Sequence, residues 1–319
     1  MTTIGNTLQN PLFISPYIRT LAFHENILHE ELIAIKGSGL NGRITKEDVI
    51  EYLENRSKSS SANKNNPEIP DTSVIEDTQP VSDENGEYIP LSRLRKLIAS
   101  KMVASAHTSP HVTSFVEVNV SRMVNWRAKV KNEFMSKYGV NLTFTPIFIE
   151  AVINGLKKYP TINASLIGDY LYVKKNINIG LATALPDGNL IVPVINSADN
   201  LDLSGLAKSI SDLAVRARTS SLKPNEIQGS SFTITNVGSF GNIGGTPIIN
   251  QPELAILAIG SIVKKPVAVQ TENGYGVAVQ DVVELWLSYD HRVIDGALGG
   301  TFLKYIADYL NDFDDTRSI

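Results

Sequence analysis

Apolar and polar residues recur along this chain with two different periods. Alternation with a period of two predicts strands, whereas apolar residues three to four positions apart predict helices that bury one face. Residues 147–159 show the helical pattern; Thr145-Pro146 is a favoured helix start, and Pro160 ends the helix. The same analysis predicts strands at 115–120, 176–184, 189–195, 230–237, 255–263 and 275–290, and helices within 203–213 and 296–313. The C-terminal part of the chain is therefore predicted to mix helices and strands in one large domain.

A short module over residues 11–54 precedes this domain. Ser15-Pro16 is typical of a helix N-terminus, and Thr45 followed by Asp48 predicts a capping box. Two short helices bury little apolar surface, so we expect this module to be only marginally stable. Residues 55–87 are rich in Ser, Asn, Pro and acidic residues and predict a flexible linker. The main domain is then 88–319.

Composition narrows the functional classes. The chain has 319 residues, a formal net charge of −4 and no cysteine. Disulfides, cysteine-based metal sites and a cysteine nucleophile are therefore excluded, and the acidic balance argues against nucleic acid as the main partner. No apolar run reaches the length of a membrane span, and the N-terminus lacks the pattern of a secretory signal.

The strongest chemical signal is the stretch SYDHRVIDG, residues 288–296. His291 stands between a predicted strand and a predicted helix, and an imidazole titrates near neutral pH, as a general base should. Asp295, four residues later, could orient that base. It could equally be the N-cap of the helix that follows, since aspartate is favoured there.

This stretch resembles the DHRxxDG signature of the dihydrolipoamide acyltransferases, the core components of 2-oxo acid dehydrogenase complexes. All five fixed positions match: Asp290, His291, Arg292, Asp295 and Gly296. The resemblance runs through residues 88–319. It implies a chloramphenicol-acetyltransferase-like α/β (α+β) fold, in which helices flank a mixed β-sheet.

The N-terminal module resembles the peripheral subunit-binding domain of the same family, through SPYIRTLA (15–22) and IKGSGLNGRITKEDV (35–49). In that family the domain holds the decarboxylase or the dihydrolipoamide dehydrogenase component. The resemblance implies that Arg19, Arg43 and Lys46 make this contact. Taken alone, three basic residues on a small domain are more typical of a solvated surface.

The resemblance also implies a reaction, in which an acyl group passes from a dihydrolipoyl arm to coenzyme A. His291 would remove the proton of the coenzyme A thiol, and Thr235 would donate a hydrogen bond to the oxyanion. Thr233 is the alternative donor, because residues two apart on a strand share a face. Asp295 would orient the turn, and the implied partner of this carboxylate is Arg95.

Arg127 is the implied contact of coenzyme A. From the residues alone, Arg95 and Arg127 are also compatible with exposed helical arginines. The other histidines show no partner pattern, and we expect His111 to be structural. The glycine-rich segment 238–245 lacks the Lys-Ser/Thr ending of a phosphate loop.

Family members build homotrimers in which His291 of one chain would face Thr235 of the next, and the trimers form a cubic or dodecahedral cage. The sequence contains no Asp-Lys-Ala turn of a lipoyl domain, so we expect the lipoyl group from a domain not present in this chain. The resemblance implies no metal, no nucleic-acid or membrane partner, and a location in the bacterial cytoplasm or the mitochondrial matrix. Pyruvate, branched-chain and 2-oxoglutarate complexes share these motifs, so the acyl group stays open.

Two other functions are compatible with parts of the sequence. One is an assembly scaffold that binds partner subunits without its own catalysis, and the other is a small-molecule acetyltransferase. The intact DHRVIDG stretch argues against the first, and the subunit-binding module argues against the second.

Overall fold

The structure is a computed structural model that describes residues 18, 27, 31, 35, 37–39, 43–59, 85–185, 188–272 and 274–319. The chain divides into two compact units, Met1–Tyr88 and Ile89–Ile319. None of the helices in these described ranges is long and apolar enough to cross a membrane.

The small unit contains helix α3 (Lys46–Ser59) and an aliphatic core. The capping box predicted at its start is confirmed. The Asp48 carboxylate accepts hydrogen bonds from the backbone N–H of Thr45 at 2.8 Å and of Ser38 at 2.9 Å, while the Asp48 N–H donates to the Thr45 hydroxyl at 3.4 Å. These backbone donors, from Ser38 first and then Thr45, hold the pKa of Asp48 well below its ordinary value. The helix predicted at Ser15-Pro16, Arg19 and most of the predicted linker lie outside the described residues.

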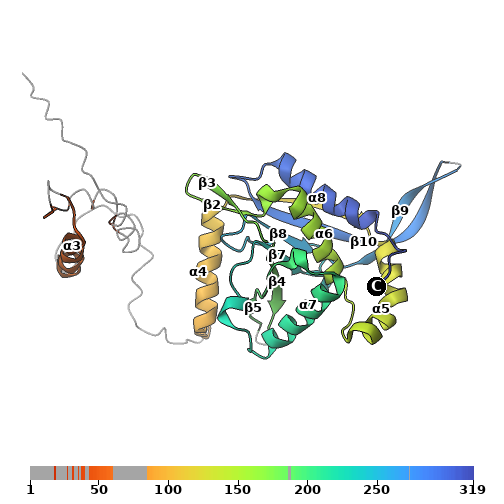
Figure 1. The fold of residues 1–319 in the computed structure, drawn as a ribbon, viewed down its shortest axis with the longest axis horizontal. Coiled ribbons are helices and arrows are strands. Elements are labelled where there is room, and N and C mark those ends of the chain that lie inside the picture. The colour runs from red at the N-terminus through yellow and green to blue at the C-terminus, as the bar shows by residue number, and fades with distance from the viewer. Residues whose placement is uncertain are drawn as a thin grey trace, which may run out of the picture. The chain divides into compact units, whose positions relative to one another are not determined.

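An eight-stranded mixed sheet forms the centre of the large unit (Figure 1). Its strands are β1 (His111–Asn119), β4 (Ile179–Ala184), β5 (Leu190–Ile191), β6 (Val194–Ile195), β7 (Phe232–Asn236), β8 (Ala255–Ile259), β9 (Val263–Thr271) and β10 (Gly274–Asp290). The order is β1-β10-β8-β7-β4-β5, with β6 paired to β4 and β9 to β10. β7 is parallel to both β4 and β8, and the other pairs are antiparallel. β2 (Ala164–Ile167) and β3 (Tyr170–Val173) form a separate hairpin.

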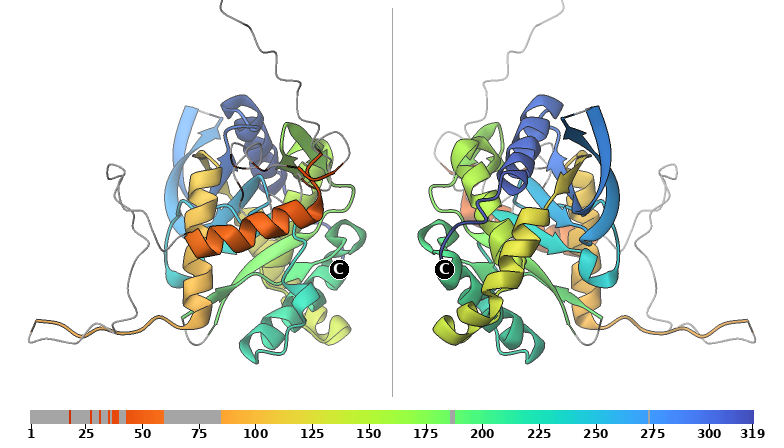
Figure 2. Two further views of the ribbon diagram at one scale, coloured as in Figure 1. Left: turned by 90° about the vertical axis from the view of Figure 1, so that its left-hand side faces the viewer. Right: turned by 90° about the vertical axis from the view of Figure 1, so that its right-hand side faces the viewer.

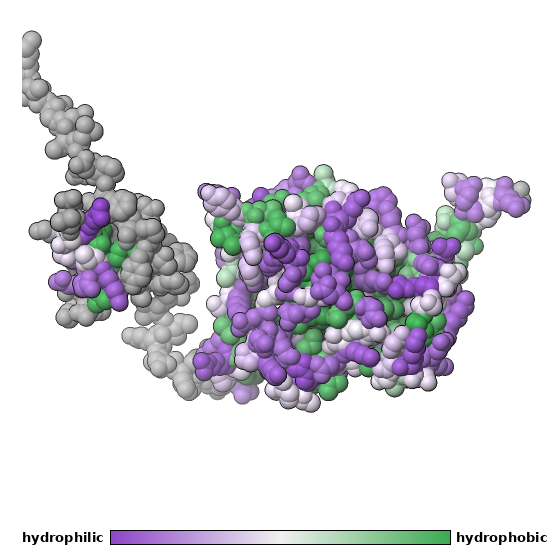
Figure 3. Space-filling view, viewed as in Figure 1, coloured by the Kyte–Doolittle hydropathy of each residue, from purple (hydrophilic) through white to green (hydrophobic). Residues whose placement is uncertain are grey.

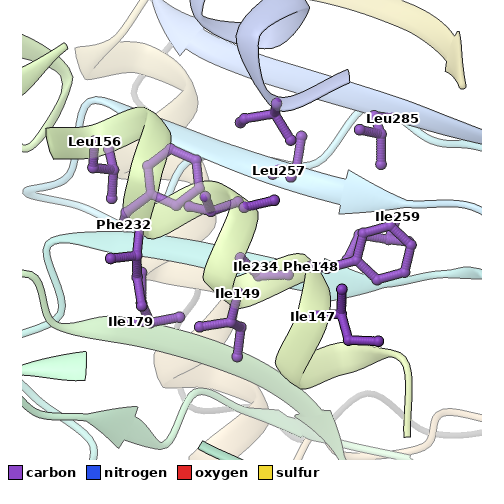
Figure 4. Close-up of a cluster of buried hydrophobic side chains, with 14 of the residues drawn as sticks. Ile147, Phe148, Ile149, Leu156, Ile179, Phe232, Ile234, Leu257, Ile259 and Leu285 are labelled. Carbon is purple, nitrogen blue, oxygen red and sulfur yellow. The ribbon is translucent and has the colours of Figure 1, made fainter. Parts of the chain in front are cut away.

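Helices flank this sheet, as predicted. They are α4 (Arg93–Thr108), α5 (Ser121–Tyr138), α6 (Thr145–Lys158), α7 (Leu203–Arg218) and α8 (Gly296–Asn311), with short 3-10 turns at Pro160–Ile162, Ala198–Asn200, Pro224–Glu226 and Gly238–Phe240. α6 and α8 lie across one face of the sheet, and α4 stands at the side of the unit (Figures 1 and 2). Figure 4 shows Ile149 and Leu156 of α6 beside Ile179, Phe232 and Ile234 of the sheet, all fully buried.

The predicted helix that opens at Thr145-Pro146 is confirmed, but the predicted single strand 255–263 is wrong. Strand β8 ends at Ile259, and β9 begins only at Val263. A Cβ atom at Gly260 would lie 1.9 Å from the Ile243 carbonyl oxygen, so another segment crosses the chain closely there and only glycine fits. The predicted strand 189–195 likewise divides into β5 and β6 around Pro193, which has no N–H to donate to a ladder.

The Asp48 bonds generate a prediction for the small unit. Asp48→Asn should speed hydrogen exchange over residues 43–59, because an amide accepts these backbone donors less strongly than a carboxylate. A depressed carboxyl pKa stabilises the fold above the unfolded pKa of about 3.9, and this stabilisation is lost as the pH falls further. The difference between variant and wild type should therefore shrink on acidification below about pH 4. Exchange of the full chain by mass spectrometry measures it. Glu47→Gln, which removes an exposed charge from the same helix, is the control, and equal exchange in both variants would contradict the capping role.

Candidate active site

His291 begins the turn that joins β10 to α8. Its N–H donates to the Pro110 carbonyl oxygen at 2.9 Å, which ties this turn to the start of β1. Its ring is exposed and lies 6.1 Å from the Tyr289 ring, at an interplanar angle of 30°. Within the described part of the chain, no hydrogen bond holds the imidazole, so its nitrogens are open to a ligand.

The neighbouring Asp290 is fully buried and anchors the turn. Its carboxylate accepts hydrogen bonds from the Arg292 guanidinium, the closest at 2.6 Å, and from the Ser109 hydroxyl at 2.6 Å. Burial alone would raise the pKa of Asp290, but the hydrogen bonds from Arg292 and Ser109 outweigh it and hold the pKa below its ordinary value. Asp290 is therefore a buried, ionised group.

Asp295 is the N-cap of α8, and its carboxylate accepts a hydrogen bond from the Leu298 N–H at 2.7 Å. Arg95, its predicted partner, instead donates to the Gly188 carbonyl oxygen at 3.2 Å. Among the described contacts of this chain, none joins Arg95 to Asp295. The capping interpretation of Asp295 thus accounts for the hydrogen bond observed here.

The two candidate hydroxyls of β7 differ in their surroundings. Thr233 is buried and donates to a Glu253 carboxylate oxygen at 2.9 Å. Thr235 is only partly buried and lines a cavity of about 540 Å³. Both polar and apolar side chains line this cavity, among them Thr143, Thr183, Ser211, Ala214 and Arg218. Within the described residues, only Thr235 of the two presents a hydroxyl without a hydrogen-bond partner.

The sheet register keeps His291 and Thr235 apart within one chain. Thr235 pairs with Ala258, and Ala258 pairs with Trp286, so these three residues form one row across β7, β8 and β10. His291 lies five residues beyond Trp286 and two strands away from Thr235. At about 3.3 Å per residue and 4.8 Å per strand, their Cα atoms are separated by roughly 15–20 Å. A single chain therefore does not bring this base and this hydroxyl together.

Arg127, the predicted coenzyme A contact, lies on α5. Its guanidinium donates to the Leu142 carbonyl oxygen at 2.7 Å and stacks over the Phe144 ring at 5.0 Å. Asn141 and Thr143, which flank Leu142, line the cavity beside Thr235. In this structure Arg127 therefore fixes the loop that forms one wall of the cavity.

The remaining predicted residues are distributed as follows. Arg43 and Lys46 are exposed on the small unit, and Arg19, His24 and His29 lie outside the described residues. His107 is exposed, whereas the His111 ring donates to the Ser109 carbonyl oxygen at 2.6 Å and accepts from the Ile249 N–H at 2.9 Å. No cluster of three metal-ligating side chains occurs in the ranges that the structure describes.

Glu253 is a buried acid that sequence analysis missed. One oxygen accepts hydrogen bonds from Ser230, Thr233 and Asn250, and the other has no partner among the described residues. Burial raises its pKa to about 7, although these donors lower it. The available signal in the sequence was the position of Glu253, which directly precedes six apolar residues, the last five of which form the buried strand β8.

An exposed histidine on a tightly anchored turn and a hydroxyl beside a substrate-sized cavity are the parts of a general-base acyl-transfer site. The comparisons give the family. The chain matches the "2-oxoacid dehydrogenases acyltransferase (catalytic domain)" family over residues 83–316 and the "e3 binding domain" family over residues 12–50. It belongs to the 2-oxoacid dehydrogenase acyltransferases and carries an E3-binding domain.

Two relatives from Bacillus subtilis (strain 168) illustrate the family. The chain is 38% identical to the lipoamide acyltransferase component of the branched-chain alpha-keto acid dehydrogenase complex, over 96% of the chain and 72% of the relative. It is also 38% identical to the succinyltransferase component of the 2-oxoglutarate dehydrogenase complex, over 93% of the chain and 68% of the relative.

Solved structures agree with this assignment. The dihydrolipoamide acetyltransferase of Azotobacter vinelandii matches with a TM-score of 0.68 and 36% identity, over 75% of this chain and 98% of that chain. A serine, a histidine and an asparagine have been investigated for their role in its catalytic mechanism. The cubic core of the pyruvate dehydrogenase multienzyme complex matches with a TM-score of 0.66 and 36% identity, over 75% and 98% of the two chains.

Glu253 generates a prediction of pH-dependent stability. Its pKa is raised to about 7 in the folded chain, so protonation favours folding. Stability should be greatest below the unfolded pKa of about 4.3 and should fall as the pH rises through about 7, at up to about 1.4 kcal/mol per unit. Between pH 5 and pH 8 the wild type should therefore lose on the order of 5 °C of melting temperature relative to Glu253→Gln, which cannot ionise.

Calorimetry at one fixed chain concentration measures this difference, because association also shifts melting temperatures. Glu272→Gln, at an exposed site, should keep the wild-type pH dependence. Parallel pH profiles of the wild type and Glu253→Gln would show that Glu253 does not titrate in this range.

Proposed function

We propose that this chain transfers an acyl group between a dihydrolipoyl arm and coenzyme A, with His291 as the general base. A thiol is a weak nucleophile until it ionises, and its ordinary pKa is about 8.5. His291 takes the proton of the coenzyme A thiol as the sulfur attacks the thioester carbonyl. When the tetrahedral intermediate collapses, the dihydrolipoyl sulfur leaves and receives that proton back from His291. The imidazole is exposed and has no hydrogen-bond partner among the described residues, which supports this role.

Thr235 donates its hydroxyl proton to the oxyanion of the tetrahedral intermediate. A positioned donor of this kind changes turnover by about 100- to 1000-fold. Two observations support Thr235: it lines the cavity, and the competing Thr233 hydroxyl is committed to Glu253. In the A. vinelandii enzyme the histidine and asparagine investigated stand four residues apart, as His291 and Asp295 do here, and the third residue is a hydroxyl donor.

The observation that carries the rest of the proposal is the separation of His291 from Thr235 by the sheet register. Acyl transfer needs both groups at one thioester. We therefore place the site between two chains of a homotrimer, where His291 of one chain faces Thr235 of the next.

Exposed apolar surface supports this association. On the ribbon formed by β9 and β10, Tyr275, Val277 and Val279 are 82%, 79% and 69% exposed, and alternation places them on one face. Leu94, Leu97 and Val103 of α4 are exposed as well. Figure 3 shows apolar residues on the ribbon where it projects from the body of the large unit. Surfaces of this kind mark protein interfaces, and the match to a cubic core supports assembly of trimers into a larger cage.

Complementation between inactive chains tests both the mechanism and the shared site. His291→Ala should lower turnover at least about 100-fold, the low end for loss of a general base. Thr235→Ala should lower it by about 100- to 1000-fold. When equal amounts of the two variants are unfolded and refolded together, chance pairing should leave roughly one quarter of the sites with both residues intact. Transfer from an acyl-coenzyme A to dihydrolipoamide measures the recovery.

The control is to mix the same variants after each has refolded alone, which should restore nothing. If the co-refolded mixture stays inactive while native mass spectrometry shows mixed trimers, the site lies within one chain. Wild-type activity of His291→Ala would overturn the mechanism itself.

We further propose that the small unit binds a decarboxylase or dihydrolipoamide dehydrogenase component through an acidic surface. Its match to the E3-binding domain family supports this role. Arg43 and Lys46, both exposed, with Arg19, supply the positive charge. Attraction between exposed charges steers such binding and weakens with salt, since the Debye length falls from about 10 Å at 0.1 M to about 3 Å at 1 M.

Charge reversal at Lys46 tests this contact with little risk to the fold, because an acidic residue is favourable at the first turn of α3. Lys46→Glu should weaken binding of the purified dehydrogenase or decarboxylase component about tenfold and reduce its salt dependence. Titration calorimetry is the measurement. Lys129→Glu makes the same change of net charge on the large unit and should bind as the wild type does. Equal affinities for the two variants would count against the proposed surface.

Which acyl group the chain transfers can be determined by comparing acyl-coenzyme A donors. Relatives of equal identity act in the branched-chain and the 2-oxoglutarate complexes. Comparing kcat/KM for acetyl-, succinyl- and isobutyryl-coenzyme A assigns the chain to one of the three complexes.

A further inference from the structure

The position of His291 depends on the buried network around Asp290. Besides its carboxylate bonds, Asp290 accepts backbone hydrogen bonds from Val293 at 3.1 Å and Ile294 at 2.9 Å, and its own N–H donates to the Leu254 carbonyl oxygen at 2.8 Å. Asp290 therefore holds the end of the turn that leads into α8 and joins its start to the neighbouring segment at Leu254. Because no side chain of the described residues makes a hydrogen bond to the imidazole, the backbone of this turn and the Tyr289 ring set where His291 points.

Ser109 donates to the same Asp290 carboxylate oxygen as Arg292, but from a distant segment of the chain. It is the C-cap of α4, it is fully buried, and its hydroxyl lies 2.6 Å from the Asp290 carboxylate. Arg292 is more than one-third exposed, whereas Ser109 has no exposed surface. Ser109 is thus the contact to Asp290 that solvent does not weaken.

Gln251 supports the Ser109 hydroxyl. Its side-chain amide donates to the Ser109 oxygen at 2.8 Å, while the single hydroxyl proton of Ser109 goes to the Asp290 carboxylate, which can only accept. The segment that carries Gln251 is itself fixed: the Ile249 N–H donates to His111, and the Ile249 carbonyl oxygen accepts from Ser105 at 2.6 Å. A chain of donors therefore runs from Gln251 through Ser109 to the carboxylate beside His291.

We propose that Ser109 and Gln251 are positioning residues, which hold His291 for proton transfer by fixing Asp290. This inference rests on the proposed role of His291 as general base. The donor chain joins segments 142 residues apart (Gln251 and Ser109) and 181 residues apart (Ser109 and Asp290). It ties the turn to α4, whereas the Arg292 contact joins residues only two apart within the turn itself.

Ser231 offers a matched control, because it is also a fully buried serine that makes hydrogen bonds, in its case to Asn178, and no contact among the described residues joins it to Asp290. Ser109→Ala should lower kcat about tenfold, the value expected for a lost hydrogen bond to a charged group, with the KM values for both substrates within twofold of the wild type. Ser231→Ala should leave kcat within twofold. Equal kcat values for the two variants would overturn the proposal.

A double-mutant cycle shows whether Ser109 acts through Asp290. In an Asp290→Asn background, the tenfold effect of Ser109→Ala should shrink to less than threefold; a full tenfold effect there would overturn the proposal. Should Asp290→Asn fail to assemble, Gln251→Met takes its place. Gln251→Met and Ser109→Ala interrupt one donor chain, so their effects on kcat should not multiply, and multiplicative effects would overturn the proposal.

The His291→Ala and Ser109→Ala variants together test the positioning role of Ser109 separately from the role of His291 as general base. If His291→Ala is inactive while Ser109→Ala behaves like Ser231→Ala, the role of His291 as general base stands and only the positioning role of Ser109 is lost. If His291→Ala is fully active, the proposed function fails first.

Discussion

The pairing of Thr235 with Ala258, and of Ala258 with Trp286, decides where chemistry can occur. It places the candidate hydroxyl in the middle of the sheet and leaves the candidate base past the end of β10. Strand geometry is rigid, so a loop movement of a few ångströms cannot close a gap of roughly 15–20 Å. A second chain can close it, and the exposed apolar faces of α4 and of the β9–β10 ribbon provide surface for one. In the proposed trimer, the sheet register that separates Thr235 from His291 is then the reason that catalysis requires assembly.

Two fully buried carboxylates, Asp290 and Glu253, show how the same residue chemistry is used in opposite ways. Asp290 has a cationic partner, Arg292, and stays ionised, so it can hold a turn through strong charge-assisted bonds. Among the described residues, the donors to Glu253 are all neutral and reach one of its two oxygens, and burial raises its pKa to about 7. Lys174 lies close enough to interact with it, but desolvation also lowers the pKa of Lys174, which limits how far that pair can ionise. Both carboxylates are buried, so the difference in their charge comes from the partner that each one meets.

Local signals in the sequence predicted much of this structure. The start of α6 at Thr145-Pro146, the capping box of α3 and the strand-turn-helix around His291 follow from neighbouring residues, because short-range sterics and hydrogen bonds decide them. The break between β8 and β9 could not be predicted in this way. It depends on Ile243, which approaches Gly260 from a different segment. The contacts of Ser109 and Glu253 are likewise long-range. Their roles could therefore not be predicted, because in the sequence alone neither residue differs from an ordinary exposed serine or glutamate.

The choice between Thr233 and Thr235 shows how a distant residue can settle a local ambiguity. The two threonines are alike in type and share a face of β7, so the strand pattern treats them equally. Glu253 separates them: by accepting the Thr233 hydroxyl proton, it leaves that group unable to donate to a substrate. Thr235 lies two residues nearer the C-terminal end of β7, where it lines the cavity instead of contacting Glu253. A hydroxyl is available for catalysis only where the fold leaves its proton uncommitted, and on β7 that position is Thr235.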